Sequence, residues 1–176
     1  MASSPRRTVI LDTSAFVAGF DPFSIGEEQY TVPLVKEELD KTSALRAKLE
    51  LAEESGKVKI KTPQEPFLNE AKASAKTVGD TFFLSATDHQ VLALALELRN
   101  GGCSPLIATD DYSIQNVAKQ LGIEFAPLIT FGIRRRLQWI RYCPACHERY
   151  PADYGSRTCR VCGTELKRKP LKNQPP

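Results

Sequence analysis

Four cysteines near the C-terminal end constrain the fold of this chain more than any other feature. They form two C-x2-C pairs, Cys143 with Cys146 and Cys159 with Cys162, and twelve residues separate the pairs. The two cysteines of a pair can bind the same metal ion from a tight turn. Four thiolates from the two pairs match one tetrahedral Zn²⁺, with Zn–S distances of about 2.3 Å. Such a site leaves no position open for a substrate. We therefore expect one structural Zn²⁺ that holds a small unit rigid, with Gly163 supplying a positive-φ turn after the last cysteine.

Two disulfide bonds are the alternative. No apolar signal segment precedes Asp12, which favours a cytoplasmic protein, and a reducing interior favours metal over disulfides. No stretch of the sequence approaches the ~18 apolar residues that a membrane-spanning helix needs, so we expect no membrane partner. The fifth cysteine, Cys103, stands alone in NGGCSP and is expected to be a free thiol.

The charge of the chain is divided unevenly along its length. Residues 1–130 contain 13 Lys and Arg against 18 Asp and Glu, which gives −5, whereas residues 131–176 contain 11 against 3, which gives +8. An acidic body with a basic, metal-bound end indicates a polyanionic partner such as RNA or DNA. Contact between the basic part and another protein is the alternative interpretation.

The first 130 residues alternate short apolar strands with helical stretches. Strands are expected at 8–12, 31–33, 57–60, 104–110 and 122–125, and helices at 34–54, 66–76, 85–100 and 112–122. This alternation predicts an α/β fold in which helices cover both faces of a parallel sheet. We divide the chain into a domain at 1–130, a basic connector at 131–141, a zinc ribbon at 142–167 and a flexible basic tail at 168–176.

Acidic side chains follow the expected strands or begin the expected helices. They are Asp12, Glu37, Glu38, Asp88, Asp110 and Asp111. Ligands gather outside the carboxyl ends of parallel strands, so these carboxylates can converge in one acidic pocket. A divalent cation would relieve their mutual repulsion, and oxygen ligands favour Mg²⁺ or Mn²⁺. The alternative is that Asp88 and Asp111 only cap their helices and that Glu37 is only solvated.

Four segments of the body occur in an order that is typical of PIN-domain nucleases. They are VILDTSAF, VPLVKEELDK, LSATDHQVLALALEL and IATDDYSIQNVAKQLGI. Together with the four-cysteine ribbon, they resemble the Nob family over about residues 8–167, and the compact length is similar to that of archaeal members. The resemblance implies a PIN-like domain at 1–130 and a metal-dependent endoribonuclease that cleaves the 3′ end of small-subunit precursor rRNA during ribosome maturation. Its partners would be that rRNA, the assembling small ribosomal subunit and other assembly factors.

The resemblance also implies roles for individual residues. The metal-binding catalytic carboxylates would be Asp12, Glu38, Asp88 and Asp111, with Ser14 and Asp110 supporting them and the four cysteines binding zinc. Glu38 matches the family's pattern better than Glu37, whereas the choice between Asp110 and Asp111 stays open, as does that between Mg²⁺ and Mn²⁺. Two rival hypotheses remain, a non-catalytic rRNA-binding assembly factor and a PIN ribonuclease with another RNA substrate.

Arginines surround the cysteine pairs and are the candidate RNA-binding residues. They are Arg134, Arg135, Arg136, Arg141, Arg149, Arg157 and Arg160. Guanidinium groups suit phosphates, and aromatic rings stack on unpaired bases. Four aromatic residues, Trp139, Tyr142, Tyr150 and Tyr154, are interleaved with these arginines. They are expected either to contact RNA or to form the small core of the ribbon.

Overall fold

The chain forms two compact units, Met1–Arg134 and Arg135–Pro176. The computed structural model describes residues 5–39, 43–78, 84–132, 138–151 and 153–171. Within these ranges, no helix has both the length and the apolar character that crossing a membrane requires.

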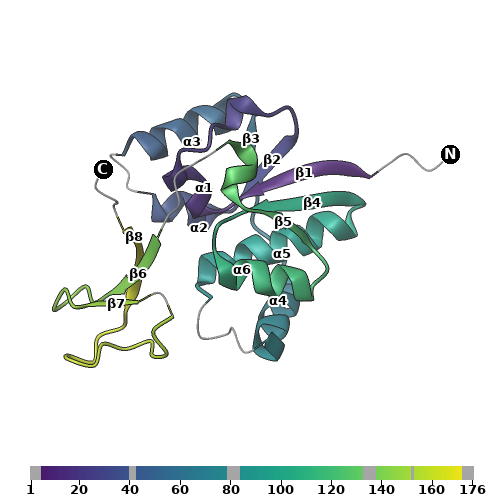
Figure 1. Ribbon diagram of the computed structural model, residues 1–176. Coiled ribbons are helices and arrows are strands. Elements are labelled where there is room, and N and C mark those ends of the chain that lie inside the picture. The colour runs from purple at the N-terminus through teal and green to yellow at the C-terminus, as the bar shows by residue number, and fades with distance from the viewer. Residues whose placement is uncertain (1–4, 40–42, 79–83, 133–137, 152, 172–176) are drawn as a thin grey trace. The chain divides into compact units, whose positions relative to one another are not determined.

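The first unit is built on a five-stranded parallel sheet (Figure 1). Its strands are β1 (Arg6–Leu11), β2 (Glu28–Thr31), β3 (Val58–Ile60), β4 (Cys103–Ala108) and β5 (Glu124–Ala126), in the order β3-β2-β1-β4-β5. The central strand β1 pairs with β2 on one side and, over its full length, with β4 on the other. Successive connections run outward from β1 in opposite directions, so the carboxyl ends of β1 and β4 lie next to each other at a topological switch point.

Helices cover both faces of this sheet. They are α1 (Thr13–Ala18), α2 (Pro33–Glu38), α3 (Ala44–Glu54), α4 (Glu65–Val78), α5 (Ala86–Asn100) and α6 (Tyr112–Gln120), with the short 3-10 helices η1 (Pro22–Ser24) and η3 (Leu128–Phe131). Figure 1 shows α1 and α3 on one face and α4, α5 and α6 on the other. The predicted α/β fold with a parallel sheet between helices is confirmed.

The core of the first unit lies where α5 packs against β4 and β1. Every residue from Val91 to Leu98 of α5 is buried, as are Val9, Ile10 and Leu11 of β1. Each large aliphatic side chain that is buried in this way contributes about 1.5–3 kcal/mol. Asp12, which follows β1, and Asp88, in the first turn of α5, are therefore attached to elements of this buried core.

The single helix predicted at 34–54 is two helices in the structure. Leu39 leaves α2 with an extended backbone, at φ −75° and ψ 128°. A second start signal follows, because the Ser43 hydroxyl accepts a hydrogen bond from the Arg46 amide at 3.1 Å and caps α3. Pro33 begins α2, which suits the first turn of a helix, so the preceding strand β2 ends at Thr31 and not at Pro33 as expected.

Local sequence signals mark both ends of α5, the helix expected at 85–100. The Ser85 hydroxyl and the Asp88 carboxylate form a reciprocal capping box at its beginning. The helix ends at Asn100, where Gly101 and Gly102 follow. These local contacts fix the position of Asp88 in the first turn of the buried helix.

The second unit contains a three-stranded antiparallel sheet. Its strands are β6 (Gln138–Tyr142), β7 (Arg149–Pro151) and β8 (Lys167–Leu171), in the order β7-β6-β8. The strand β6 occupies part of the stretch that the sequence suggested as a connector, and β8 extends into the suggested flexible tail. Both differences have one cause, because β6 and β8 are ordered by pairing with each other across a long sequence separation.

Candidate functional site

Asp12 lies at the end of the central strand and is buried, with only 4% of the residue exposed. It precedes α1 but its side chain does not cap that helix. The Asp12 Oδ2 atom accepts hydrogen bonds from the Ser14 hydroxyl at 2.8 Å and from the Thr109 hydroxyl at 3.0 Å. The carboxylate is thus held between the ends of β1 and β4, and Ser14 makes the contact expected of a supporting residue.

The electrostatic environment of Asp12 is unfavourable to its charged form. Burial raises the pKa of Asp12 from 3.8 to about 6, and the nearby negative charges of Asp111 and, to a smaller extent, Glu38 add to this rise. The hydroxyls of Ser14 and Thr109 oppose the rise in pKa by donating to the carboxylate. A buried carboxylate with two acidic neighbours fits the oxygen-rich, negatively charged site that Mg²⁺ or Mn²⁺ prefers.

The two members of the aspartate doublet have different partners. The Asp110 Oδ1 atom accepts a hydrogen bond from the Leu128 amide at 2.8 Å and fixes the start of η3. Asp111 is buried, its Oδ1 atom accepts from the Ser113 amide at 2.9 Å to cap α6, and its charge acts on Asp12. This geometry favours Asp111 as a residue of the acidic pocket and Asp110 as a supporting residue.

Glu38 connects two helix starts, although it is exposed. One of its carboxylate oxygens, Oε2, accepts a hydrogen bond from the Thr13 hydroxyl at 2.5 Å, and the other, Oε1, accepts from the Thr87 hydroxyl. These contacts reach the first turns of α1 and α5, the helices that begin beside Asp12 and Asp88. They favour Glu38 over its neighbour Glu37 as the acidic residue of the pocket.

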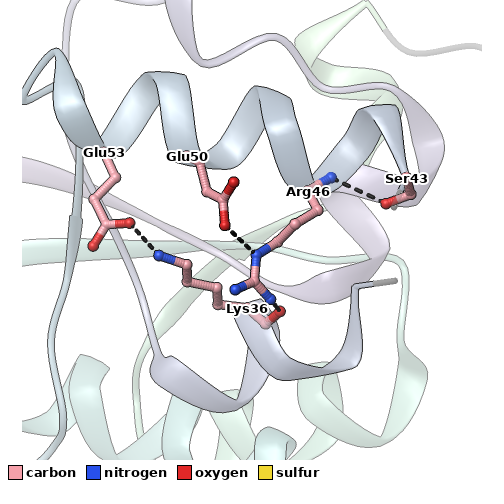
Figure 2. A network of polar contacts seen from close by, with 5 residues as sticks. All are labelled: Lys36, Ser43, Arg46, Glu50 and Glu53. Carbon is pink, nitrogen blue, oxygen red and sulfur yellow. Dashed lines mark hydrogen bonds and ion pairs between the residues drawn. The ribbon is translucent and has the colours of Figure 1, made fainter. Parts of the chain in front are cut away.

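Glu38 is the last residue of α2, a six-residue helix that neighbouring contacts must hold in place. Figure 2 shows that α3 supplies them. The Lys36 Nζ atom lies 2.6 Å from Glu53 Oε2, and Arg46 donates to the Lys36 carbonyl oxygen while pairing with Glu50 at 2.7 Å. This network anchors the helix that carries Glu38 to the body of the unit.

Asp88 is buried and has a structural contact of its own. Its Oδ2 atom accepts a hydrogen bond from the Ser85 amide at 2.7 Å, and its own amide donates to the Ser85 hydroxyl at 3.2 Å. Asp88 and Asp111 both cap helices, as the structural alternative proposed. A carboxylate has two oxygens with about four acceptor positions, so capping a helix and binding a metal do not exclude each other.

Three residues that the sequence analysis missed organise this pocket. They are the threonines Thr13, Thr87 and Thr109, which donate hydrogen bonds to Glu38 or Asp12. Each lies directly beside a predicted carboxylate, in the segments DTS, ATD and TDD. A threonine hydroxyl next to a candidate metal-binding carboxylate was therefore the sequence signal that could have identified these residues.

The carboxylates of the pocket are spaced more widely than the cysteines. Within the described part of the chain, the four cysteine sulfurs form the single group of at least three His, Cys, Asp or Glu ligand atoms that all lie within 4.8 Å of one another. Mg²⁺ usually retains several waters and binds only one or two protein carboxylates together with substrate phosphates. The spacing of the acidic pocket fits that kind of binding.

The cysteine cluster supports a structural zinc site. The sulfur of Cys143 lies 3.3 Å from that of Cys162, and the sulfur of Cys146 lies 3.4 Å from that of Cys159. A tetrahedral zinc site with Zn–S bonds of about 2.3 Å places its sulfurs ~3.8 Å apart, whereas a disulfide requires about 2.05 Å. All five cysteines, including Cys103, are free thiols, so the disulfide alternative is wrong for this structure.

The two cysteine turns share one backbone pattern. The residue after the second cysteine has a positive φ in both, 62° at His147 and 74° at Gly163, which confirms the turn expected there. Its amide donates to the carbonyl of the first cysteine, at 2.9 Å in one turn and 2.8 Å in the other. The first turn thus places a non-glycine residue where the second has glycine, and this backbone conformation is costly for side chains.

Exchanging residues at these positions should change zinc affinity in opposite directions. We expect Gly163→Ala to lower the affinity about fivefold, since the left-handed conformation costs ~1 kcal/mol and no atom lies within 4 Å of the added Cβ. His147→Gly should raise it by a similar factor. Competition with a chromogenic chelator measures both, and equal affinities in the two variants would contradict the strain argument.

The candidate RNA-binding arginines differ in exposure. Arg149, Arg157 and Arg160 are exposed, whereas Arg134, Arg135 and Arg136 lie outside the described residues. Arg141 is only 6% exposed, and its guanidinium donates to the Ser156 carbonyl at 3.4 Å. Its burial makes Arg141 a weaker candidate for RNA contact than the exposed arginines, although RNA contact by Arg141 stays a prediction.

Aromatic residues near the zinc site form its small core. Tyr150 is buried with Cys143 and Cys159, and Tyr154 and Leu166 pack against them. The rings of Tyr150 and Tyr154 lie 4.3 Å apart, and the Tyr150 hydroxyl lies 3.0 Å from the Cys159 sulfur. The structural alternative is correct for these two tyrosines, and the exposed arginines remain the better candidates for RNA contact.

Comparison with known proteins identifies similarity in both units. The family described as "PIN domain of ribonuclease" matches residues 9–98, and the family described as "FmdE treble clef zinc finger" matches residues 134–166. The first match covers the segment that carries Asp12, Glu38 and Asp88. The second contains all four cysteines.

Curated relatives match most of the chain. A protein named "Endoribonuclease Nob1" from Methanothermobacter thermautotrophicus is 39% identical over 93% of this chain and 94% of its own length. Another of that name, from Methanocaldococcus jannaschii, is 37% identical over 98% of this chain and 82% of its own length. A "Ribonuclease VapC3" from Aeropyrum pernix is 37% identical over 67% of this chain and 84% of its own length.

Proposed function

Because the chain belongs to the Nob1 family of PIN-domain endoribonucleases, we propose that it cleaves small-subunit precursor rRNA at its 3′ end during ribosome maturation. The extent of the family similarity carries this proposal. The matches to the two relatives named Nob1 cover 93% and 98% of this chain. The unmatched remainder is shorter than the unit Arg135–Pro176, so the similarity includes residues of that unit. The similarity therefore extends to both the unit that carries the candidate carboxylates and the zinc unit, which supports the proposal.

In the proposed reaction, the carboxylates of the acidic pocket would hold a divalent metal ion. Asp12, Asp111, Glu38 and Asp88 would bind this ion, directly or through water. Mg²⁺ or Mn²⁺ would lower the pKa of a bound water molecule and would stabilise the negative charge that develops at phosphorus. The ion would also favour the ionised form of Asp12, whose pKa burial and acidic neighbours raise.

The protein's own part in this reaction is to hold the carboxylates in one orientation. Ser14 and Thr109 donate to the same oxygen of Asp12, so the rotation of that carboxylate is fixed. Thr13 and Thr87 each donate a hydrogen bond to one of the two carboxylate oxygens of Glu38, which also restricts the rotation of that carboxylate. Such preorganisation is effective because no side chain has to reorient as the reaction proceeds.

The zinc unit would bind RNA. Its exposed arginines, Arg149, Arg157 and Arg160, suit phosphate oxygens, and residues 131–176 carry a net charge of +8 from 11 basic and 3 acidic residues. The unit would bring the substrate to an acidic nuclease domain that does not itself attract polyanions. The proposed partners are the precursor rRNA and the assembling small ribosomal subunit.

Cleavage of a defined precursor tests this function. We expect the purified protein with Mn²⁺ or Mg²⁺ to make one discrete cut in a small-subunit precursor that spans the mature 3′ end. The controls are a chelator and an unrelated single-stranded RNA of the same length. Binding without cleavage would favour a non-catalytic assembly factor, and equal cleavage of the unrelated RNA would favour a PIN ribonuclease with another substrate.

A further inference from the structure

Tyr112 presents an aromatic ring to solvent next to the acidic pocket. Its exposure of 80% is the highest among the exposed large hydrophobic side chains of the described residues. A tyrosine contributes most when its ring is buried, since aromatic side chains bury about 150–250 Å² each. The first unit obtains no such benefit from Tyr112, so the ring is available to a partner.

The position of Tyr112 is fixed on both sides by the pocket itself. Asp111, the preceding residue, donates its amide to the Thr109 hydroxyl at 3.0 Å and accepts from the Ser113 amide at 2.9 Å. Gln115, one turn further on, donates to the Thr109 carbonyl at 2.9 Å. Tyr112 is therefore an exposed residue whose neighbours, Asp111 and Gln115, are hydrogen-bonded to Thr109 at the end of β4.

This placement puts Tyr112 at the start of α6, directly after the N-cap residue Asp111. Consecutive Cα atoms lie about 3.8 Å apart, so Tyr112 is one residue from a carboxylate whose charge acts on Asp12. A metal ion held by that carboxylate would bind a substrate phosphate, and the base of the same nucleotide would then be within reach of a side chain on the next residue. The exposed ring is thus suited to contact the base. The carboxylates are suited to bind the metal ion that would hold the phosphate.

Electrostatics makes stacking the favourable way to hold RNA here. Residues 1–130 carry −5, from 13 basic and 18 acidic residues, and a phosphate backbone gains little affinity from such a surface. Stacking of a base on an aromatic ring does not depend on net charge and tolerates any base. It requires an unpaired base, because the faces of a base within a duplex are covered by its neighbours.

We propose that Tyr112 stacks on an unpaired nucleobase next to the cleaved phosphate. This proposal rests on the proposed endonuclease function and adds a residue that binds the substrate beside the cut. It makes Tyr112 a substrate-binding residue and assigns the chemistry to the carboxylates. The hydroxyl has no part in the contact, so phenylalanine should replace tyrosine.

The test combines variants of the protein with abasic RNA. We expect Tyr112→Ala to raise KM, and Kd measured without metal, by about 5- to 100-fold, with kcat changed much less, and Tyr112→Phe to stay within about threefold of the parent. An abasic nucleotide beside the cut should weaken binding by the parent. The same nucleotide should have no further effect on Tyr112→Ala, because the stacking partner is already missing.

Phe23 provides a matched control in the same unit. It is also an exposed aromatic residue, at 49%, but it lies in η1, outside the segments that carry the candidate carboxylates. Phe23→Ala should leave KM, Kd and the abasic series unchanged. Equal losses in Phe23→Ala and Tyr112→Ala would overturn the proposal, as would abasic effects that are identical in the parent and in Tyr112→Ala.

Failure of this proposal and failure of the proposed function give different results. If the parent does not cut the precursor, the function fails, and the metal-free binding series still decides whether Tyr112 stacks on a base. If the parent cuts, but Tyr112→Ala cuts and binds as well as the parent, only the stacking proposal fails. Cleavage of a fully paired duplex at the rate of the single strand would also overturn it.

Discussion

Replacement of Asp12 by Asn is expected to lower RNA cleavage by at least about 100-fold, the scale for removing one group that stabilises charge in a transition state. The variant keeps the size of the side chain and an oxygen that accepts from Ser14 and Thr109. It loses the negative charge that a buried oxygen-rich metal site needs. Single-turnover cleavage of the precursor RNA in Mn²⁺ measures the effect.

The same variant should be more stable than the parent without metal at pH 7–8. Folding raises the pKa of Asp12 from 3.8 to about 6, so the folded protein favours the protonated carboxyl. The stability that this provides is fully present below pH ~4 and is lost as the pH rises through about 6, with a total of order 1–3 kcal/mol. The asparagine side chain of the variant cannot ionise and avoids that loss, so thermal unfolding in chelator should separate the two proteins at pH 8 and not at pH 4.

This pattern separates a catalytic effect from misfolding. Lost cleavage together with equal or higher stability at pH 8 supports the acidic pocket, whereas lost cleavage together with a lower unfolding temperature would not. Glu37 is the matched control, because it is exposed and adjacent to Glu38. We expect Glu38→Gln to impair cleavage and Glu37→Gln to leave it unchanged. The mechanism is wrong if Asp12→Asn cleaves as well as the parent.

Replacement of Cys143 by Ser is expected to unfold the zinc unit and leave the nuclease unit intact. Cys143 is fully buried, and the small cluster around it contains only Tyr150, Cys159, Tyr154 and Leu166 among the described residues. So small a core cannot offset the entropy of ordering the unit, whereas structural zinc contributes about 10–16 kcal/mol in comparable small domains. Metal analysis should find about one zinc per chain in the parent and much less in the variant.

Two further readouts locate the effect of this substitution. Limited proteolysis should cut within Arg135–Pro176 and spare the first unit. Affinity for the precursor RNA should fall more than about tenfold, because exposed arginines on an unfolded unit lose their arrangement, while Mn²⁺ binding at the acidic pocket is retained. Cys103→Ser is the control, since Cys103 is a free thiol on β4. Full zinc content and protease resistance in Cys143→Ser would contradict a four-cysteine site.

Much of the acidic pocket could be predicted, because its residues lie at recognisable ends of elements. Asp12 follows a buried strand, and Asp88 lies three residues after the serine that caps its helix, so short-range patterns located both. The choice between Asp110 and Asp111 could not be made in this way. It depends on Leu128, which lies 18 residues from Asp110 in sequence and contacts it only in the folded chain.

The same distinction applies to the zinc unit. The spacing of its cysteines is a local property, so the metal site was evident without a structure. The strand β6 was not, because it is stabilised by pairing of Gln138–Tyr142 with Lys167–Leu171. The burial of Arg141 could not be predicted for the same reason, since a charged side chain in a basic stretch gives no indication that a strand will bury it.

The sequence by itself determined the α/β class, the four-cysteine zinc site and the set of acidic residues, because each follows from short-range periodicity or spacing. Only the tertiary structure decided how these residues meet. It placed Thr13, Thr87 and Thr109 against the carboxylates, anchored the helix of Glu38 through Arg46, and left Tyr112 exposed beside Asp111. Such contacts join residues that are up to 97 positions apart, as Thr109 and Asp12 are. Packing of the whole chain, which local patterns do not encode, decides them.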